Sequence, residues 1–262
     1  MINKENIFNV LEHNRELLPM IRSRVAETKD QALSFRYKPI ESIKSYLMKN
    51  TQVLQFPSKN KNYGGLVSYR NGRYYIHINT GQPKTYENLM WVHEYYHFKY
   101  KAEEIKNSDV RTFFDEAIVN EKERCANLFA AELLIDSMLL AEQFNMINEL
   151  YADELLESRV VRLIPVFKIP YKAIVVKLAQ DGLILDGEAV TIIDYRYRDN
   201  LPVDFDQTLL KPSMAIQINN LKSLLNNEAV KTNMSETDLS SFQTVFEQHF
   251  NNLEALREKH KE

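Results

Sequence analysis

The sequence predicts an α+β fold in which a small, mostly antiparallel sheet packs on one functional helix and a helical region follows. Three observations predict this class. Two β-rich runs flank Asn71-Gly72, a pair whose tolerance of positive φ suits the tight turn of a hairpin. Two segments at about 85–101 and 120–135 then have helical spacing or helix-forming composition. Helical patterns dominate most of the remaining chain.

The N-terminal part is predicted to form helices followed by short strands. Apolar residues at spacings of three, four and seven over residues 3–27 predict an amphipathic helix that is kinked or split at Pro19. A shorter helical pattern covers about 39–49, and the run TQVLQFP then predicts a short strand. The hairpin LVSYRNGRYYIHIN supplies the next two strands.

The C-terminal part is predicted to be mainly helical. Helical periodicity continues from Ser137 onward, whereas the later run AVTIIDYRY predicts a strand. A further helix is expected near 213–227. The run DNLPVDFD marks an expected boundary before the last part of the chain. We expect residues 1–188 to form the main domain with its trailing helix pair, and residues 189–262 to form a helical C-terminal extension.

The last predicted helix, capped by Ser235, carries an apolar stripe. The stripe consists of Leu239, Phe242, Phe246, Phe250, Leu253 and Leu256. Core packing or self-association through the C-terminal helices explains such a stripe most simply. A groove or sensor surface for another partner is the alternative.

Composition excludes several classes of partner. The 262 residues carry a formal net charge of -3, so no single-sign field marks a nucleic-acid or membrane-surface binder. Basic residues around 159–177 could contact DNA, but neighbouring acidic residues dilute them, and we expect a structural helix pair without direct nucleic-acid binding. No run is long and apolar enough for a membrane span, and the start lacks signal-peptide features. Together with the single Cys125, this predicts a soluble cytoplasmic protein.

The run WVHEYYHFKY contains the spacing His-Glu-x-x-His. On a helix, His93 and His97 lie one turn apart on the same face and can bind one metal ion. Glu94 is rotated by about 100 degrees from His93, which keeps it out of the coordination shell but within reach of a water on the metal. Such a set suits metal-assisted hydrolysis, because zinc acidifies the water and the carboxylate accepts its proton. Two incidental histidines on a solvated helix are the competing interpretation.

A third ligand is expected from the segment around residue 120, where Glu116, Glu121 and Glu123 are candidates. Glu123 shares one helix face with Asn127 and with small apolar residues further along, and an inward-facing Glu is costly unless it is paired or bound to metal. Asn127 could accept the free N–H of a ligand histidine. Glu121 lies on the other side of that helix and is expected to be solvated, and Cys125 is expected to be a small buried hydrophobe.

These segments together resemble the ImmA/IrrE metallopeptidases. A strand ending in IHIN, the motif HEYYH and the segment ERCANLFAAELLI match that family's HExxH motif and its later Glu-x-x-x-Asn segment, and VFKIPYKAIVVKLAQDGLI extends the resemblance over about residues 40–185. The resemblance implies a zincin-like, gluzincin-type core. His93, His97 and Glu123 would be the metal ligands and Glu94 the general base. Zinc is the expected ion, although manganese or another divalent ion suits the same ligands.

Two departures from the family pattern concern the substrate cleft. Tyr96 stands where the family usually has a small residue, and its phenol would need space against the neighbouring strand. Ile135-Asp136 replaces the usual Met-Pro. Tyr95, Tyr96 and His77 are considered as contacts to the substrate or to the oxyanion, although aromatic or cross-strand packing also explains each of them.

The resemblance implies a zinc-dependent endopeptidase that cleaves a cytoplasmic helix-turn-helix repressor and so derepresses a prophage, a mobile element or a stress regulon. Two other functions remain open. In one, the protein is a non-catalytic regulator that is stabilised by metal and sequesters a repressor or another partner. In the other, it is a general protease of unfolded proteins.

Overall fold

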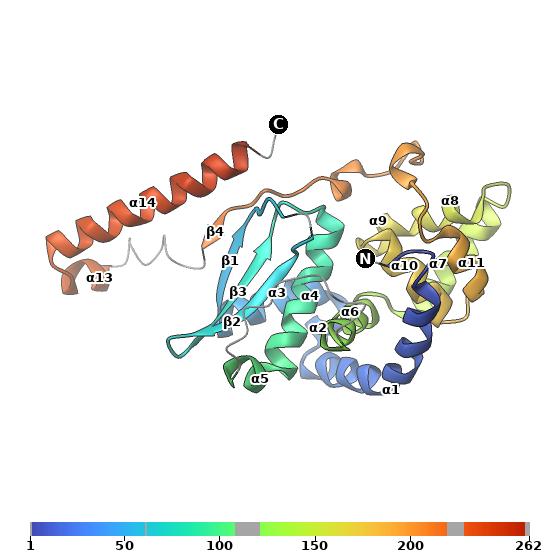
Figure 1. Ribbon diagram of the computed structural model, residues 1–262, viewed down its shortest axis with the longest axis horizontal. Helices are drawn as coiled ribbons and strands as arrows, with labels where there is room; N and C mark the ends of the chain where they lie inside the picture. The colour runs from blue at the N-terminus through green and yellow to red at the C-terminus, as the bar shows by residue number, and fades with distance from the viewer. Residues whose placement is uncertain (1, 61, 108–120, 219–227, 260–262) are drawn as a thin grey trace.

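The computed structural model describes residues 2–60, 62–107, 121–218 and 228–259 (Figure 1). The N-terminal helices come first in the chain: α1 (Ile7–Gln31), α2 (Leu33–Tyr37) and α3 (Pro39–Asn50). Pro19 lies inside α1, which bends along its length (Figure 1). This agrees with the kinked helix expected there, because proline removes a backbone hydrogen bond from the interior of a helix.

The sheet has four strands in the order β2-β3-β1-β4. The strands are β1 (Gln52–Phe56), β2 (Gly65–Arg70), β3 (Arg73–Asn79) and β4 (Gln217–Ile218). β2 and β3 form the predicted hairpin, and Asn71 and Gly72 at its turn have φ of 48° and 77°. β1 is parallel to β3 and antiparallel to β4. Two of the three pairings are therefore antiparallel, and the predicted α+β class with a mostly antiparallel sheet is confirmed.

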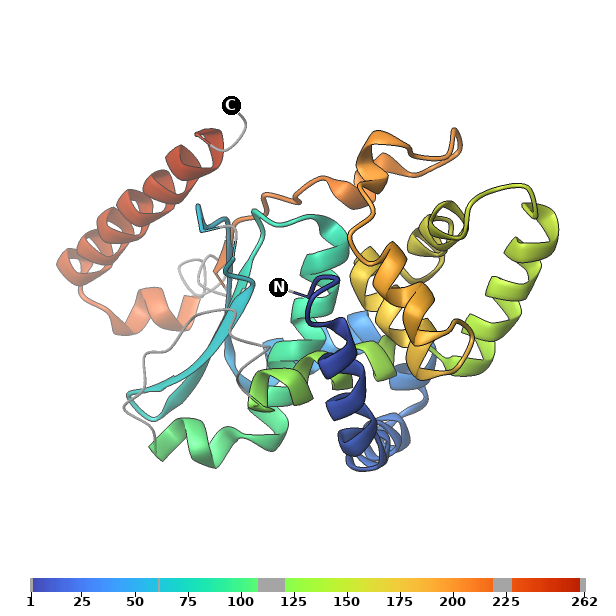
Figure 2. The same ribbon diagram turned by 45° about the vertical axis from the view of Figure 1, so that its right-hand side comes forward.

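Helix α4 (Lys84–Tyr100) packs on one face of this sheet (Figures 1 and 2). Alternate residues of β3 point to opposite faces, and Ile76 and Ile78 lie with Trp91 of α4 in one fully buried cluster. His77 and Asn79 therefore point to the face of the sheet away from α4. Nearly the whole first half of α4 is buried, so the fold fixes this helix rigidly beneath the sheet.

Helix α6 (Glu121–Leu134) packs against both α4 and α1, and the short α5 (Ala102–Asn107) follows α4. Ala126 and Ala130 of α6 are fully buried. Side chains of this size let two helices approach closely. The residues between α5 and α6, including Glu116, lie outside the described part of the chain.

A second hydrophobic cluster joins the first turns of α1 to the helices that follow α6 (Figure 2). These helices are α7 (Ser137–Leu150), α8 (Leu156–Val161), α9 (Leu163–Phe167), α10 (Tyr171–Gln180) and α11 (Asp186–Ile192). The strand expected over AVTIIDYRY was wrong, because α11 occupies its first half. Ala189 and Ile192 are buried three residues apart, and the Glu188 side chain accepts a hydrogen bond from the Leu185 N–H at 2.7 Å. The β-branched residues suggested a strand, but tertiary burial at helical spacing decides the structure.

The chain then returns to the sheet through the short helices η1 (Tyr197–Asp199) and η2 (Gln207–Leu210). The Met214 N–H donates to the Thr80 carbonyl at 3.0 Å, and Ile218 pairs with Leu54 in β4. The helix expected near 213–227 was therefore wrong for residues 213–218, which complete the open edge of β1. Residues 219–227 lie outside the described part of the chain.

The described chain ends with α13 (Glu228–Asn233) and α14 (Glu236–Glu258). The Ser235 hydroxyl accepts a hydrogen bond from the Asp238 N–H at 3.1 Å, which is the predicted cap. In both views, α14 stands beyond the sheet, on the opposite side of the molecule from α7 and α11 (Figures 1 and 2). No helix in the described ranges is long and apolar enough to cross a membrane.

Candidate metal centre

Helix α4 places both histidines of the motif on its face toward α6. The His93 and His97 Nε2 atoms lie 3.1 Å apart, as expected for side chains one helical turn apart. His93 is only 5% exposed. Two neutral imidazoles at this distance can share only one proton between their Nε2 atoms, and without that proton both lone pairs can bind one cation.

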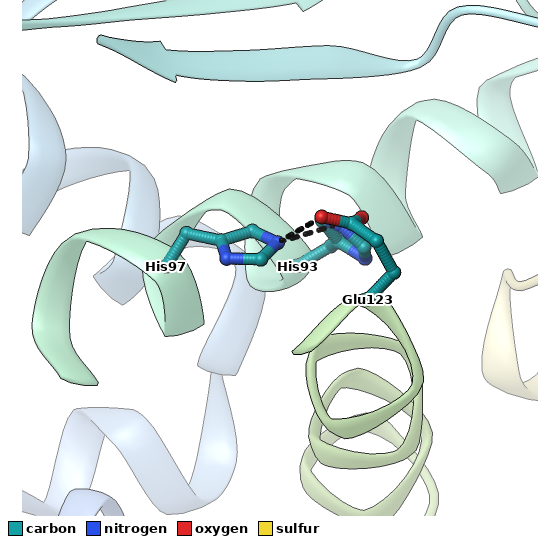
Figure 3. Close-up of side chains that lie close together, drawn as sticks. All are labelled: His93, His97 and Glu123. Carbon is teal, nitrogen blue, oxygen red and sulfur yellow. Dashed lines mark hydrogen bonds and ion pairs between the residues drawn. The ribbon is translucent and has the colours of Figure 1, made fainter. Parts of the chain in front are cut away.

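Glu123, at the start of α6, supplies the third group (Figure 3). Its Oε2 lies 3.0 Å from His93 Nε2, and its Oε1 lies 3.3 Å from His97 Nε2. Within the described ranges, these residues form the one cluster of three His, Cys, Asp or Glu side chains placed to hold a metal ion. Glu121 is exposed, and Cys125 is buried with a free thiol.

The three ligand atoms fit a divalent ion. Zinc binds His nitrogen and carboxylate oxygen at about 2.0 to 2.1 Å with tetrahedral geometry, which separates neighbouring ligand atoms by about 3.3 Å. The shortest separations here are close to that value: 3.0 Å from His93 Nε2 to Glu123 Oε2, 3.1 Å between the two Nε2 atoms, and 3.3 Å from His97 Nε2 to Glu123 Oε1. Two histidines and one carboxylate also leave a fourth position open, as catalytic zinc sites do.

Asn127 lies one turn beyond Glu123 and contacts the far side of the His93 ring. Its Oδ1 lies 2.9 Å from His93 Nδ1. Because an amide oxygen only accepts hydrogen bonds, we assign a ring proton to Nδ1, which makes Nε2, the atom that faces Glu123 and His97, the nitrogen available to a metal. Asn127 therefore holds the tautomer of His93 that can bind a metal.

Glu94 lies against the start of β2 and is only 3% exposed. A Cβ built on Gly65 would lie 2.6 Å from Glu94 Oε1 and 2.9 Å from the His77 carbonyl oxygen. Only glycine fits this contact without a shift of its neighbours. Burial raises the pKa of Glu94 to about 8, and the negative charge of Glu123 adds to this effect, while His93 opposes it. A carboxyl with a pKa in this range can accept and return a proton near neutral pH.

The charges within the cluster are strongly coupled. Burial lowers the pKa of His93, but the hydrogen bond to Glu123 and the charges of Glu94 and Glu123 outweigh burial and raise this pKa to about 9. Burial lowers the pKa of His97. Burial also opposes ionisation of Glu123, yet its hydrogen bonds to both histidines bring its pKa well below the usual range. Glu123 therefore stays ionised and provides the negative charge that a cation requires.

Tyr95, Tyr96 and His77 are not part of the cluster, although the Tyr96 ring lies edge-on to the His97 ring with centroids 6.0 Å apart. Tyr95 and Tyr96 are fully buried among aromatic rings on the sides of α4 that face α1, α3 and α6. The Tyr96 hydroxyl contacts Arg24 of α1, so the phenol does not press on the neighbouring strand. His77 is stacked on Phe56 on the far face of the sheet.

One part of the candidate site was missed in the sequence. Gly65 begins the edge strand β2 and lies directly against the Glu94 carboxylate. A glycine at the start of a predicted strand can signal a close approach of the backbone to another group. That signal is present in the sequence, but it does not say which group approaches.

The fold and the cluster define an α+β protein in which the HExxH helix α4 and helix α6 together present two histidines and a glutamate. The family model described as the IrrE N-terminal-like domain, a peptidase family, matches residues 50–179. The chain belongs to the ImmA/IrrE family of metallopeptidases through this segment, which contains all four of His93, Glu94, His97 and Glu123. Comparison with curated proteins and with solved structures gave no significant match.

Proposed function

We propose that this protein is a zinc-dependent endopeptidase. The observation that supports it most directly is the convergence of His93, His97 and Glu123, whose closest ligand atoms lie 3.0 to 3.3 Å apart, with the buried Glu94 next to His93 in sequence. When bound there, a divalent ion supplies a Lewis acid that polarises the scissile carbonyl and acidifies water. Manganese or another divalent ion fits the same ligands, and zinc is the choice that the family resemblance implies.

The residues of the chain supply the proton transfers. Glu94 accepts a proton from the attacking water and later delivers it to the leaving amine. Its burial keeps the carboxyl basic, and contact with Gly65 fixes where the carboxylate points. Glu123 and Asn127 hold the His93 ring from both nitrogens, so the ligand geometry is set before substrate binds.

The proposed substrate is a cytoplasmic transcriptional repressor of the helix-turn-helix type. Cleavage of such a repressor would derepress a prophage, a mobile element or a stress regulon. This substrate class comes from the family resemblance, and the described residues around the metal centre identify none. The proposed action on a repressor places the protein in the cytoplasm.

The test incubates the zinc-loaded protein with the helix-turn-helix repressor encoded beside its gene and follows new peptide termini by mass spectrometry. We expect cleavage by the wild type, loss with a chelator, and loss in Glu94→Gln with zinc retained. Glu121→Gln changes an exposed carboxylate on α6 and should cleave normally. Equal cleavage by the wild type and Glu94→Gln would refute the enzymatic proposal. Cleavage of casein as well would indicate a general protease.

The second candidate function is a non-catalytic regulator that binds a repressor or another partner. The observation that favours it is α14, a long amphipathic helix with no buried residue among its described side chains. This candidate predicts that the protein releases the repressor from its operator without any new cleavage product. It also predicts that Glu94→Gln releases the repressor as well as the wild type does.

A further inference from the structure

Helix α14 combines length, amphipathic spacing and separation from the rest of the fold. It has 23 residues and is therefore about 34 Å long. None of its described side chains is buried, and its apolar residues Leu239, Phe242, Phe246, Leu253 and Leu256 are half-buried, so part of this face is open to solvent. The helix stands beyond the sheet in both views (Figures 1 and 2). An apolar helix face on the outside of a protein is a candidate contact surface.

The apolar face of α14 has the spacing of a coiled coil. Residues recur at alternating steps of three and four, which places them at the a and d positions of a heptad repeat. The seam consists of Leu239, Phe242, Phe246, His249, Leu253 and Leu256. Phe250 flanks the seam and stacks on Phe246 with ring centroids 5.7 Å apart. A regular seam of this length is suited to another helix.

The seam is complementary to itself when two copies run antiparallel. A two-fold axis between residues 247 and 248 places Leu239 opposite Leu256 of the second copy. The same axis places Phe242 opposite Leu253, and Phe246 opposite His249. Every seam position then meets another seam position, as a symmetric homodimer interface requires.

The charges beside the seam agree with this arrangement. Glu236 and Asp238 flank its beginning, and Arg257 and Lys259 flank its end. In the antiparallel pair, Glu236 lies opposite Arg257 of the second copy, and Asp238 lies opposite Lys259. The two-fold axis repeats both pairs at the other end, which gives four ion pairs between opposite charges. Flanking charges of this kind set the partner and the orientation in coiled coils.

A parallel pair lacks this complementarity. In a parallel pair, the g position of one heptad faces the e position five residues later on the other copy. Asp238 would face Gln243, and Asn252 would face Arg257, so no opposite charges would meet. The charge pattern therefore selects the antiparallel orientation.

We propose that α14 is a self-association helix, which pairs antiparallel with α14 of a second copy of this chain through the Leu239–Leu256 seam. The inference is independent of the proposed peptidase function, because it uses no residue of the metal centre. It identifies the occupant of the apolar face as a second copy, since the seam and the charges of one helix complement those of the same helix turned end to end.

The test measures the oligomeric state of the full chain by sedimentation equilibrium. We expect a dimer for the wild type, with an association that weakens as salt is added. Reversing the acidic end with E236K/D238K, or the basic end with R257E/K259E, puts like charges opposite each other. Each double variant should raise the dissociation constant at least tenfold.

Mixing the two double variants distinguishes a lost charge contact from a destabilised helix. An equimolar mixture of the two double variants should restore dimers, because every reversed end then meets the opposite charge. A helix that had only lost its own stability would not be rescued in this way. The control E247K reverses a charge outside the seam and its flanks, and should dimerise like the wild type. A monomeric wild type, a dimer insensitive to the reversals, or a mixture that stays monomeric would overturn the proposal.

Discussion

Replacement of Asn127 by alanine tests how the chain prepares its metal site. The Asn127 Oδ1 lies 2.9 Å from His93 Nδ1, and the His93 side chain is only 7% exposed. Alanine removes the acceptor and leaves a buried N–H without this partner, which costs about 1 to 3 kcal/mol. It also frees the ring to rotate or to place its proton on Nε2, the atom that faces Glu123.

The expected loss of metal affinity follows from this contact. Removing a group that orients a ligand histidine typically weakens metal binding about 10- to 100-fold, which corresponds to about 1.4 to 2.7 kcal/mol. We therefore expect the zinc dissociation constant of Asn127→Ala to rise by that factor. The assay is competition against a fluorescent zinc chelator at neutral pH.

A matched control separates this effect from a general loss of packing. Asn88 lies on α4, is 5% exposed and donates to the Lys168 carbonyl at 3.0 Å, away from the cluster. Asn88→Ala should lower the free energy of unfolding but leave the zinc dissociation constant unchanged. The reasoning is refuted if Asn127→Ala binds zinc as tightly as the wild type, or if both variants lose affinity equally.

Three further changes test other parts of the structure. Lys177→Met removes the buried ammonium that contacts Glu132 and Asp181 at 2.6 and 2.9 Å and leaves both carboxylates with Arg22, at 3.1 and 3.2 Å. Urea unfolding should show a loss of about 3 kcal/mol, and a loss below about 1 kcal/mol would contradict this. Gly65→Ala should displace Glu94 and cut repressor cleavage at least tenfold with zinc retained. The control is Gly187→Ala, whose added Cβ meets nothing within 4 Å and which should cleave like the wild type. Equal cleavage by Gly65→Ala and Gly187→Ala would count against the contact between Gly65 and Glu94. Burial lowers the pKa of His77 to about 4, so its unfolded form takes up a proton first as pH falls. Compared with His77→Gln, the wild type should lose up to about 3 kcal/mol of unfolding free energy between pH 6.5 and 4, and parallel pH curves would disprove this.

The fold was predictable wherever local chemistry and tertiary burial agree. Asn71-Gly72 between two β-rich runs specifies its hairpin without help from the rest of the chain. The segment at Asp186–Ile192 could not be predicted in the same way, because its β-branched residues favour a strand while burial of Ala189 and Ile192 selects a helix. β4 was also missed, since a two-residue strand exists only because β1 has an open edge.

The candidate site was predictable to the extent that helical spacing determines it. The spacing of four between His93 and His97, and again between Glu123 and Asn127, places each pair on one helix face. Spacing does not reveal what lies opposite a face. The packing of Tyr96 between α1 and α6, and the approach of Gly65 to Glu94, arise from tertiary contacts between segments distant in sequence.

The central claim is that Glu123 holds the metal ion while Glu94, next to a ligand in sequence, stays outside its coordination. The most direct measurement is the zinc content of Glu94→Gln and Glu123→Gln after dialysis against the same limiting zinc buffer. We predict one zinc ion per chain in the wild type and in Glu94→Gln, and its loss from Glu123→Gln. Retention of zinc by Glu123→Gln, or its loss from Glu94→Gln, would contradict the assignment.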